Sequence, residues 1–327
     1  MAKSGPGPRN DITDVPGVKI GQAHDENVRT GVSVVIPDAP AIVAGDIRGG
    51  GPGTRETDLL DPSSLVERAD AIVLAGGSSY GLAAGDGVTA FLGAAGKGFR
   101  LMETPGVPPS PIVPAAILYD LANGGDKNWG ANPPYACLGR EAAAAAGVSM
   151  SQGRAGAGFG ARAGAEQGGI GSVSYDAGRG LVIGAVMAVN SFGSVRAPGS
   201  RAFWAAPFEM NAEFGGLGGP QSGAAADFPS DTKLAGVRAN TTIGVVAVSA
   251  ALTQAQAKRI AIMAQDGIAR AIRPVHGPTD GDVIFVLATD GPKPDGPLEL
   301  TRIGTIAADC VARAIARAVF EADRPPG

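Results

Sequence analysis

The 327-residue sequence predicts an α/β fold, because apolar runs typical of buried strands alternate with segments of helical periodicity. The apolar runs are short and rich in Val, Ile and Ala, as in strands covered on both faces. Hydrophobic residues make up 44% and charged residues 18% of the chain, so a sizeable core is available. The 51 glycines suggest closely packed layers joined by tight turns.

The first elements to expect are strands. Residues 30–36 (TGVSVVI) alternate like a half-buried strand, and residues 41–47 are predicted to pair with them across the turn at 37–40. Residues 69–75 (ADAIVLA) form a continuous apolar run typical of a buried strand, and an Ala/Gly-rich helix follows through about Leu92.

The middle of the chain ends in a long irregular stretch. A short helix is predicted over 138–147 and a buried strand over 181–189 (LVIGAVMAV), with Asn190 directly at its end. Residues 192–233 are rich in Gly, Pro and Ala, which predicts a long surface excursion.

The last third of the chain repeats the strand and helix pattern. Strands are predicted over 243–250 and 283–288. Thr253 is expected to N-cap a helix through about Ile272, and a closing helix is expected over 298–321.

Composition excludes several classes of function. The net charge is −4 and no basic patch stands out, so nucleic acid is not expected as a partner. The two cysteines have no CxxC spacing, which argues against a disulfide framework and a zinc site and favours a reducing, cytoplasmic compartment. No apolar stretch reaches transmembrane length, so no membrane association is expected. No phosphate loop or metal cluster is evident, so no cofactor is implied.

Nucleotide-binding motifs fail on spacing, and a Ser-His-Asp triad is not indicated. The glycine-rich loop at 48–57 and the alternating glycines at 153–160 both lack the third glycine of G-x-G-x-x-G. The segment Gly77–Gly81 carries two adjacent serines, Ser78 and Ser79, as candidate hydrolase nucleophiles. Only His24 and His276 are present, and neither has a neighbour in sequence that indicates a Ser-His-Asp triad.

The step Asn240-Thr241 carries the main chemical hypothesis. Here a polar pair runs directly into a β-branched strand. Attack of the Thr241 hydroxyl on the Asn240 carbonyl gives an ester by an N-to-O acyl shift, and water then cuts the chain. The cut frees an α-amine whose reference pKa of about 7.7–8.0 suits a base. Thr241 is then both nucleophile and base. The alternative is that two threonines merely open a strand.

Two further polar positions stand next to predicted strands. Asn190 suits either a turn or a rigidly held donor for an oxyanion. Asp280-Gly281-Asp282 suits a turn, a fragment of a calcium loop or a charge pair that positions an amine.

Several ordered motifs together resemble the P1 family of peptidases, the N-terminal-nucleophile-type hydrolases. This family includes D-aminopeptidase/esterase, β-peptidyl aminopeptidases and 6-aminohexanoate-oligomer (nylon-oligomer) endohydrolase. The resemblance spans nearly the whole chain. It is carried by Asp14-Val15-Pro16-Gly17-Val18, Arg48-Gly49-Gly50, Gly76-Gly77-Ser78-Ser79-Tyr80-Gly81-Leu82, Arg154-Ala155-Gly156-Ala157-Gly158, Val189-Asn190, Asn240-Thr241-Thr242-Ile243 and Asp280-Gly281-Asp282.

The resemblance implies a four-layer α/β/β/α sandwich like that of ornithine acetyltransferase, formed by 1–327 as a single domain. It implies self-cleavage into 1–240 and 241–327 and a homotetramer of cleaved protomers. It further implies roles at the site for Thr241 (nucleophile), Asn190 (oxyanion donor), Asp280 and Asp282 (contacts to the new amine and the nucleophile) and Tyr119 (lining the site). The Asn240-Thr241 cleavage site resembles that of the nylon-oligomer hydrolases.

The chain departs from this family at one position. Relatives often carry a lysine in the segment aligned with 160–171, where this chain has Ala165 and Gln167, with Arg162 nearby. Arginine stays protonated and does not readily act as a base. This departure predicts slower self-cleavage or a different substrate.

Three functions therefore follow from the sequence. The first is a self-processing hydrolase of peptides or ω-amide oligomers. The second is an acyltransferase on the same fold, which passes the acyl group to an amine. The third is an uncleaved binding protein that has lost activity along with the lysine.

Overall fold

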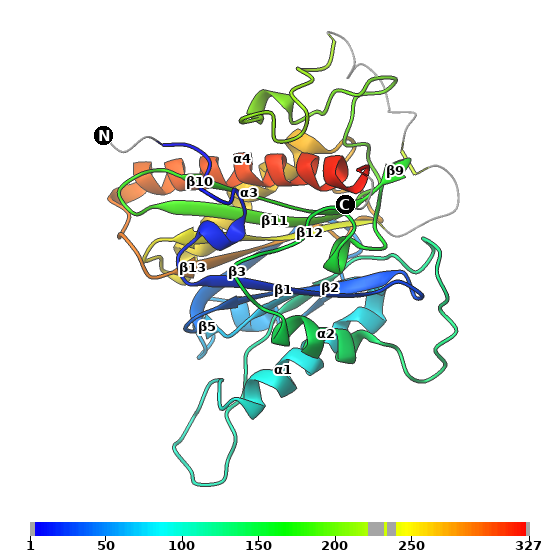
Figure 1. Ribbon diagram of the computed structural model, residues 1–327. Helices are drawn as coiled ribbons and strands as arrows, with labels where there is room; N and C mark the ends of the chain where they lie inside the picture. Colours follow the sequence, from blue (N-terminus) through cyan, green and yellow to red (C-terminus); the bar gives the residue numbers. More distant parts are fainter. Residues whose placement is uncertain (1–3, 222–231, 234–239, 325–327) are drawn as a thin grey trace.

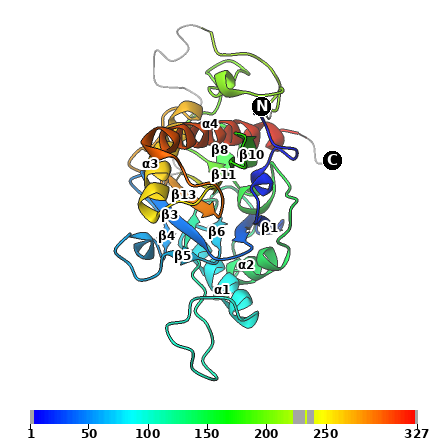
Figure 2. The ribbon, with the colours of Figure 1, turned by 90° about the vertical axis from the view of Figure 1, so that its left-hand side faces the viewer.

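Two β-sheets lie face to face between two layers of helices (Figure 1). The computed structural model describes residues 4–221, 232–233 and 240–324. In the side view of Figure 2, α3 and α4 cover one outer face and α1 and α2 the other. The predicted four-layer α/β/β/α sandwich is confirmed.

The upper sheet in Figure 1 has six strands in the order β10-β11-β12-β13-β3-β5. The bounds of its strands and of its covering helices are β3 Ala41–Ile47, β5 Arg68–Ala69, β10 Gly169–Asp176, β11 Val182–Asn190, β12 Thr241–Ser249, β13 Val283–Thr289, α3 Gln254–Ala271 and α4 Gly296–Ala322. The predicted N-cap of α3 is confirmed. The Thr253 side chain accepts from Gln256 N, and the Thr253 backbone N–H donates to Gln256 Oε1.

The second sheet has five strands in the order β1-β2-β6-β7-β4. Its strands and its covering helices are β1 Val18–Asp25, β2 Thr30–Pro37, β4 Thr54–Arg55, β6 Ile72–Ala75, β7 Ala115–Ile117, α1 Ala84–Ala94 and α2 Tyr135–Ala144. The remaining elements are the strand pair β8 Arg162–Ala163 and β9 Glu166–Gln167 and the 3₁₀ helices Ile12–Asp14, Asp58–Leu60, Ser78–Ala83, Gly156–Gly158 and Ala206–Phe208.

Strand alternation divides the core into three apolar clusters. Along β12, Ile243, Val245 and Ala247 point between the two sheets, whereas Val246 and Val248 point to α3 and α4. A third cluster lies between β2, β6, α1 and α2. Strands buried on both faces explain why these segments appear in the sequence as continuous apolar runs.

The structure corrects the predicted hairpin at 30–47. β2 pairs with β1 and β6, whereas β3 pairs with β13 and β5, so the turn at 37–40 carries the chain from one sheet to the other. β1 and β10 were not predicted. Both carry polar or small residues, such as Ser172 and Ser174 in β10, which weaken the strand pattern.

The order and direction of the central strands bring three loops together. β11 runs antiparallel to β12 and ends at Asn190, directly opposite Thr241 at the start of β12. β13 runs parallel to β12, so residues 280–282, just before β13, also lie at this end. An isolated parallel bridge joins Asn240 to Asp280.

One buried ion pair ties α4 to the rest of the molecule. Arg313 Nε lies 2.6 Å from Glu213 Oε1, with the two side chains 1% and 4% exposed. The Arg313 guanidinium also donates to Ser174 O and to Asn10 Oδ1. Removal of one partner from such a pair leaves the other charge buried without compensation.

Arg313→Met is therefore expected to lower the free energy of unfolding by about 3–5 kcal/mol. Arg324→Met is the matched control, because the Arg324 pair with Glu321 is exposed and is expected to contribute less than about 1 kcal/mol. Urea denaturation of both variants measures the difference. Equal stability of the two variants would contradict this reading of the pair.

Among the residues that the structure describes, no helix combines the length and the apolar character that a membrane span requires.

Candidate active site

Thr241 lies at the head of β12 with its side chain directed between the sheets. It follows the alternation of Ile243, and the residue is 3% exposed. Its hydroxyl donates to the carbonyl oxygen of Asn240 at 2.5 Å, and the backbone N–H of Gly281 donates to the same oxygen at 2.8 Å. The carbonyl between Asn240 and Thr241 is thus polarised by a fixed N–H next to a hydroxyl.

The segment Asp280–Asp282 is held by the glycine-rich loop after β3. Gly51 N donates to Asp280 O at 2.7 Å, and Arg48 N donates to Asp282 O at 3.0 Å. A Cβ on Gly49 would lie 2.1 Å from Asp280 O, so only glycine allows this approach. The glycines of this loop therefore serve a tight backbone path that supports the site.

Asp280 offers a free acceptor at the site. Its Oδ2 accepts from Gly277 N at 2.7 Å, whereas its Oδ1 is buried and has no partner among the described residues. Burial, followed by the negative charge of Asp282, raises the pKa of the Asp280 carboxyl to about 6. An unpaired buried acceptor is costly unless a donor arrives, and an amine on Thr241 would be such a donor.

Asp282 has a different environment. Its Oδ1 accepts from the backbone N of Thr242 at 2.7 Å, and its Oδ2 lies 2.8 Å from His276 Nδ1. Both oxygens are therefore engaged. Asp282 fixes the start of β12, and His276, which had no informative neighbour in the sequence, fixes Asp282.

Asn190 lies opposite Thr241 with its side chain on the same face of the sheet, because paired residues of antiparallel strands share a face. Its Nδ2 donates to Tyr119 O at 2.9 Å. Its Oδ1 accepts from Asn123 Nδ2 and from Arg162 N, each at 3.0 Å. The amide is thus oriented with its nitrogen as the donor, as an oxyanion site needs.

The other sheet contributes the support for Asn190. Asn123 follows β7, and its N–H donates to Asp120 O at 3.0 Å. The buried Asp120 carboxyl in turn accepts from Thr30 Oγ1 and Gly77 N at 2.7 Å each, while burial raises its pKa. A Cβ on Gly77 would overlap the Tyr135 ring, which explains why the motif at 76–77 requires glycine.

Tyr119 reaches the site through its backbone. Its carbonyl oxygen accepts from Asn190 Nδ2, and its side chain is half-buried. The structure therefore brings Thr241, Asn240, Asn190, Asp280 and Asp282 together and adds Tyr119 as a backbone acceptor.

A lysine also lies at the site, contrary to the expectation from 160–171. Lys233 Nζ donates to the backbone O and to the Oδ1 of Asn190, both at 3.1 Å. Burial, followed by the nearby Arg162 charge, lowers the pKa of the Lys233 amine to about 7. Lys233 ends the predicted surface excursion 192–233, of which 222–231 lie outside the described residues.

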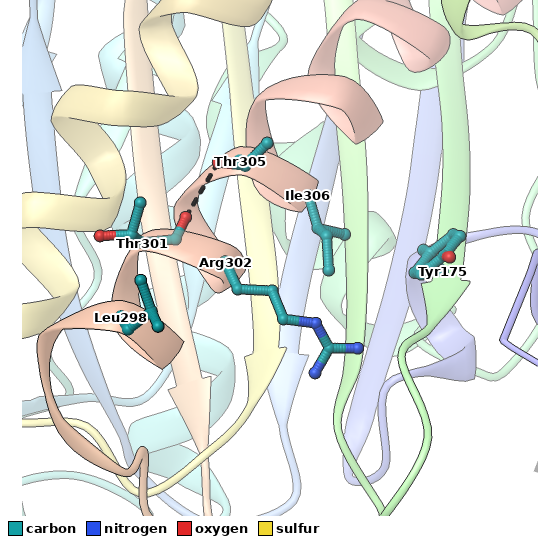
Figure 3. A pocket seen from close by; sticks show the side chains of 6 residues that line it. All are labelled: Tyr175, Leu298, Thr301, Arg302, Thr305 and Ile306. Atoms are coloured by element: carbon teal, nitrogen blue, oxygen red, sulfur yellow. Dashed lines mark hydrogen bonds between the residues drawn. The ribbon is translucent and has the colours of Figure 1, made fainter. Parts of the chain in front are cut away.

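The pocket in Figure 3 is not part of this site. It is lined by Tyr175 and by residues from the first turns of α4, including Arg302 and Ile306. Tyr175 pairs through β11 with Val248, at the end of β12 opposite to Thr241. Seven residues of strand separate the two ends, about 23 Å.

The sequence profile of Peptidase family S58 matches residues 10–327. The chain belongs to this family. An uncharacterized aminopeptidase of Mycobacterium bovis is 43% identical, over 97% of this chain and 96% of its own length. A 6-aminohexanoate-oligomer endohydrolase of Agromyces sp. is 32% identical, over 85% of this chain and 74% of its own length. The resemblance seen in the sequence is confirmed, and as a member of this family the chain is a peptidase-type amide hydrolase.

Solved structures give the same fold. A β-aminopeptidase of Burkholderia sp. superposes with a TM-score of 0.70 at 22% identity, covering 97% of this chain and 88% of the other. The L-aminopeptidase D-Ala-esterase/amidase of Ochrobactrum anthropi, described as a variant of the Ntn hydrolase fold, also has a TM-score of 0.70, at 20% identity and with 98% and 89% coverage.

Sequence reasoning missed four parts of the site in this S58 peptidase: the Gly281 N–H, His276, Asn123 and Lys233. The Gly281 N–H is a backbone group, His276 stands earlier in the same loop, and Asn123 and Lys233 reach the site from other loops. The Asp280-Gly281-Asp282 motif was the one signal in the sequence that could have pointed to Gly281.

Proposed function

We propose that this chain is a self-processing amide hydrolase that cuts itself between Asn240 and Thr241 and then uses Thr241 as an N-terminal nucleophile. The observation that carries the proposal is the shared carbonyl: the Asn240 oxygen accepts from both the Thr241 hydroxyl and the Gly281 N–H. These are the nucleophile and an oxyanion donor of an acyl shift, already in place.

The self-cleavage step balances as follows. Thr241 Oγ attacks the Asn240 carbonyl carbon and loses its proton, the C–N bond breaks, and the Thr241 nitrogen gains that proton. Water then hydrolyses the Asn240 ester. The products are a carboxylate on Asn240 and a free hydroxyl and an α-ammonium on Thr241, which has taken up the proton of the acid. Asp280, whose Oδ1 is unpaired among the described residues, is bridged to the neighbouring Asn240.

Turnover repeats the same chemistry on a substrate. Thr241 Oγ attacks the amide carbonyl, and its proton passes through the Thr241 amine to the leaving amine. The Asn190 Nδ2 serves the oxyanion, and water releases the acyl group as an acid. The relatives named aminopeptidase and 6-aminohexanoate-oligomer endohydrolase support small peptides or ω-amide oligomers as substrates.

We propose further that residues 1–327 remain a single folded unit after the cut. The six-stranded sheet supports this proposal, because β12 and β13 come from 241–327 and their neighbours β11 and β3 come from 1–240. Separation of the pieces would break both pairings and expose the core. A cytoplasmic homotetramer of cleaved protomers is the expected assembly on the family resemblance, and light scattering after size exclusion tests its mass.

Intact-mass spectrometry with N-terminal sequencing tests the cut. The 32.4-kDa chain should give two pieces of about 24 and 9 kDa, the smaller beginning at Thr241. Release of amine from aminoacyl p-nitroanilides and 6-aminohexanoate oligomers by the cut protein tests turnover. A chain that stays whole after days at neutral pH would refute the proposal.

The self-cleavage rate is expected to rise as pH rises through about 6. The pKa of Asp280 is raised to about 6, and only its ionised form can stabilise the ammonium that forms on Thr241. The raised pKa also affects stability. The folded state binds the Asp280 proton more tightly than the unfolded state, so the contribution of Asp280 to the free energy of unfolding falls as pH rises from 3.8 to about 6.

Quenched time courses of the precursor between pH 4.5 and 8 measure this profile. Asp280→Asn should cleave more slowly and lose the rise near pH 6. A rise that survives in Asp280→Asn would assign the titration to another group.

A further inference from the structure

Lys233 makes contacts that no step above uses. Its Nζ donates to the Asn190 side-chain oxygen and backbone oxygen, both at 3.1 Å. Its own backbone N–H donates to Phe192 O at 3.1 Å. The side chain of Lys233 is therefore bound to the last residue of β11, and its backbone is bound to Phe192 just beyond that strand.

The charges around Lys233 come from two parts of the chain. Arg162 from β8 disfavours the ammonium, and Asp280 from the loop before β13 favours it, while burial is the largest effect on its pKa. Asp282 and His276 in turn act electrostatically on Asp280. An apolar side chain could fill this buried position without the cost of burying an amine. A lysine here therefore indicates a function for the amine.

The Asn190 oxygen receives three donors, and of these only the Lys233 amine can carry a charge, in its ammonium form. The other two are Asn123 Nδ2 and the Arg162 backbone N–H. A charged donor makes a stronger bond than a neutral one and polarises the amide, which makes the Nδ2 hydrogens better donors. Both hydrogens sit on the nitrogen that shares a sheet face with Thr241.

We propose that Lys233 is a positioning residue of the active site: its amine holds the Asn190 side-chain oxygen and so keeps Asn190 Nδ2 oriented for the oxyanion. The inference rests on the function proposed above and deepens it. Lys233 belongs to the piece 1–240, and its anchors on 190–192 do not depend on the bond that is cut. It therefore serves both self-cleavage and turnover.

Lys233→Met tests this role. We expect the self-cleavage rate and kcat of the fully cut protein on an aminoacyl p-nitroanilide to fall by on the order of 10- to 100-fold, with KM changed by less than about 3-fold. Lys258→Met is the matched control: Lys258 donates to Gly45 O and pairs with Asp46 on the helix-covered side of the sheet. It should leave both rates unchanged.

A double-mutant cycle with Asn190→Ala separates positioning from other roles. If Lys233 acts through Asn190, its replacement should have less than about a 3-fold effect on self-cleavage once the Asn190 side chain is gone. An undiminished effect in the Asn190→Ala background would overturn the proposal, and so would a Lys233→Met variant as fast as wild type.

Folding is checked by circular dichroism. If Lys233→Met does not fold, Lys233→Gln replaces it in the same cycle, since its amide donates without a charge, and a fall of about 10-fold is expected. A folded Lys233→Gln as fast as wild type overturns the proposal. An uncut, inactive wild type refutes the proposed function itself, whereas an active wild type with an unaffected lysine variant refutes only this inference.

Discussion

Thr241→Ala is expected to remain a single chain of 32.4 kDa and to hydrolyse no amide, with rates lowered by at least about 10⁴-fold. In the proposed mechanism one hydroxyl supplies the nucleophile for both reactions, and without the cut no α-amine is formed to act as base. Intact mass after several days at neutral pH and an amide assay at high protein concentration measure the two losses.

Two variants make this result specific. Thr241→Ser keeps a hydroxyl on the same Cβ and should still cut itself. Thr242→Val removes the hydroxyl next along the chain, which points to the other face of the sheet and has no hydrogen-bond partner among the described residues, so cleavage should proceed. Cleavage of Thr241→Ala at the same bond would show that another group is the nucleophile.

Gly281→Ala is expected to slow self-cleavage by at least about 100-fold while the protein still folds. An added Cβ would lie 2.8 Å from both Thr241 Oγ1 and Gly51 O. It must displace the nucleophile or move the N–H that binds the Asn240 carbonyl at 2.8 Å, and either change removes the alignment needed for attack.

Gly147→Ala is the matched control, because the nearest atom to its added Cβ is 4.0 Å away and its backbone does not need a positive φ. Time courses of precursor disappearance on gels compare the two variants. If Gly281→Ala cuts as fast as Gly147→Ala, the Gly281 N–H has no part in the reaction.

The helices and the buried strands were largely predictable, because their signals are local. Thr253 and the apolar spacing of 254–271 define α3 within the helix itself. Pairing was less predictable. Residues 30–47 look like a hairpin because a short Pro-rich turn joins two strands, yet β2 and β3 lie in different sheets. A local pattern does not specify that choice.

The site divides in the same way. Thr241, Asn190 and the two aspartates could be found because each stands beside a strong strand signal, and the family resemblance assigned them roles. The different environments of the two aspartates could not be predicted from the sequence. Only the fold leaves Asp280 Oδ1 unpaired and gives both oxygens of Asp282 a donor.

The sequence by itself determined the α/β class, the family and the Asn240-Thr241 step, since periodicity and ordered motifs are properties of neighbouring residues. The tertiary structure decided which groups surround that step. Gly281 N–H, Asn123 and Lys233 meet Thr241 and Asn190 from loops far apart in the chain, because adjacent strands of two stacked sheets end at one edge. Spacing in the sequence does not predict such contacts, because strand order and direction determine them.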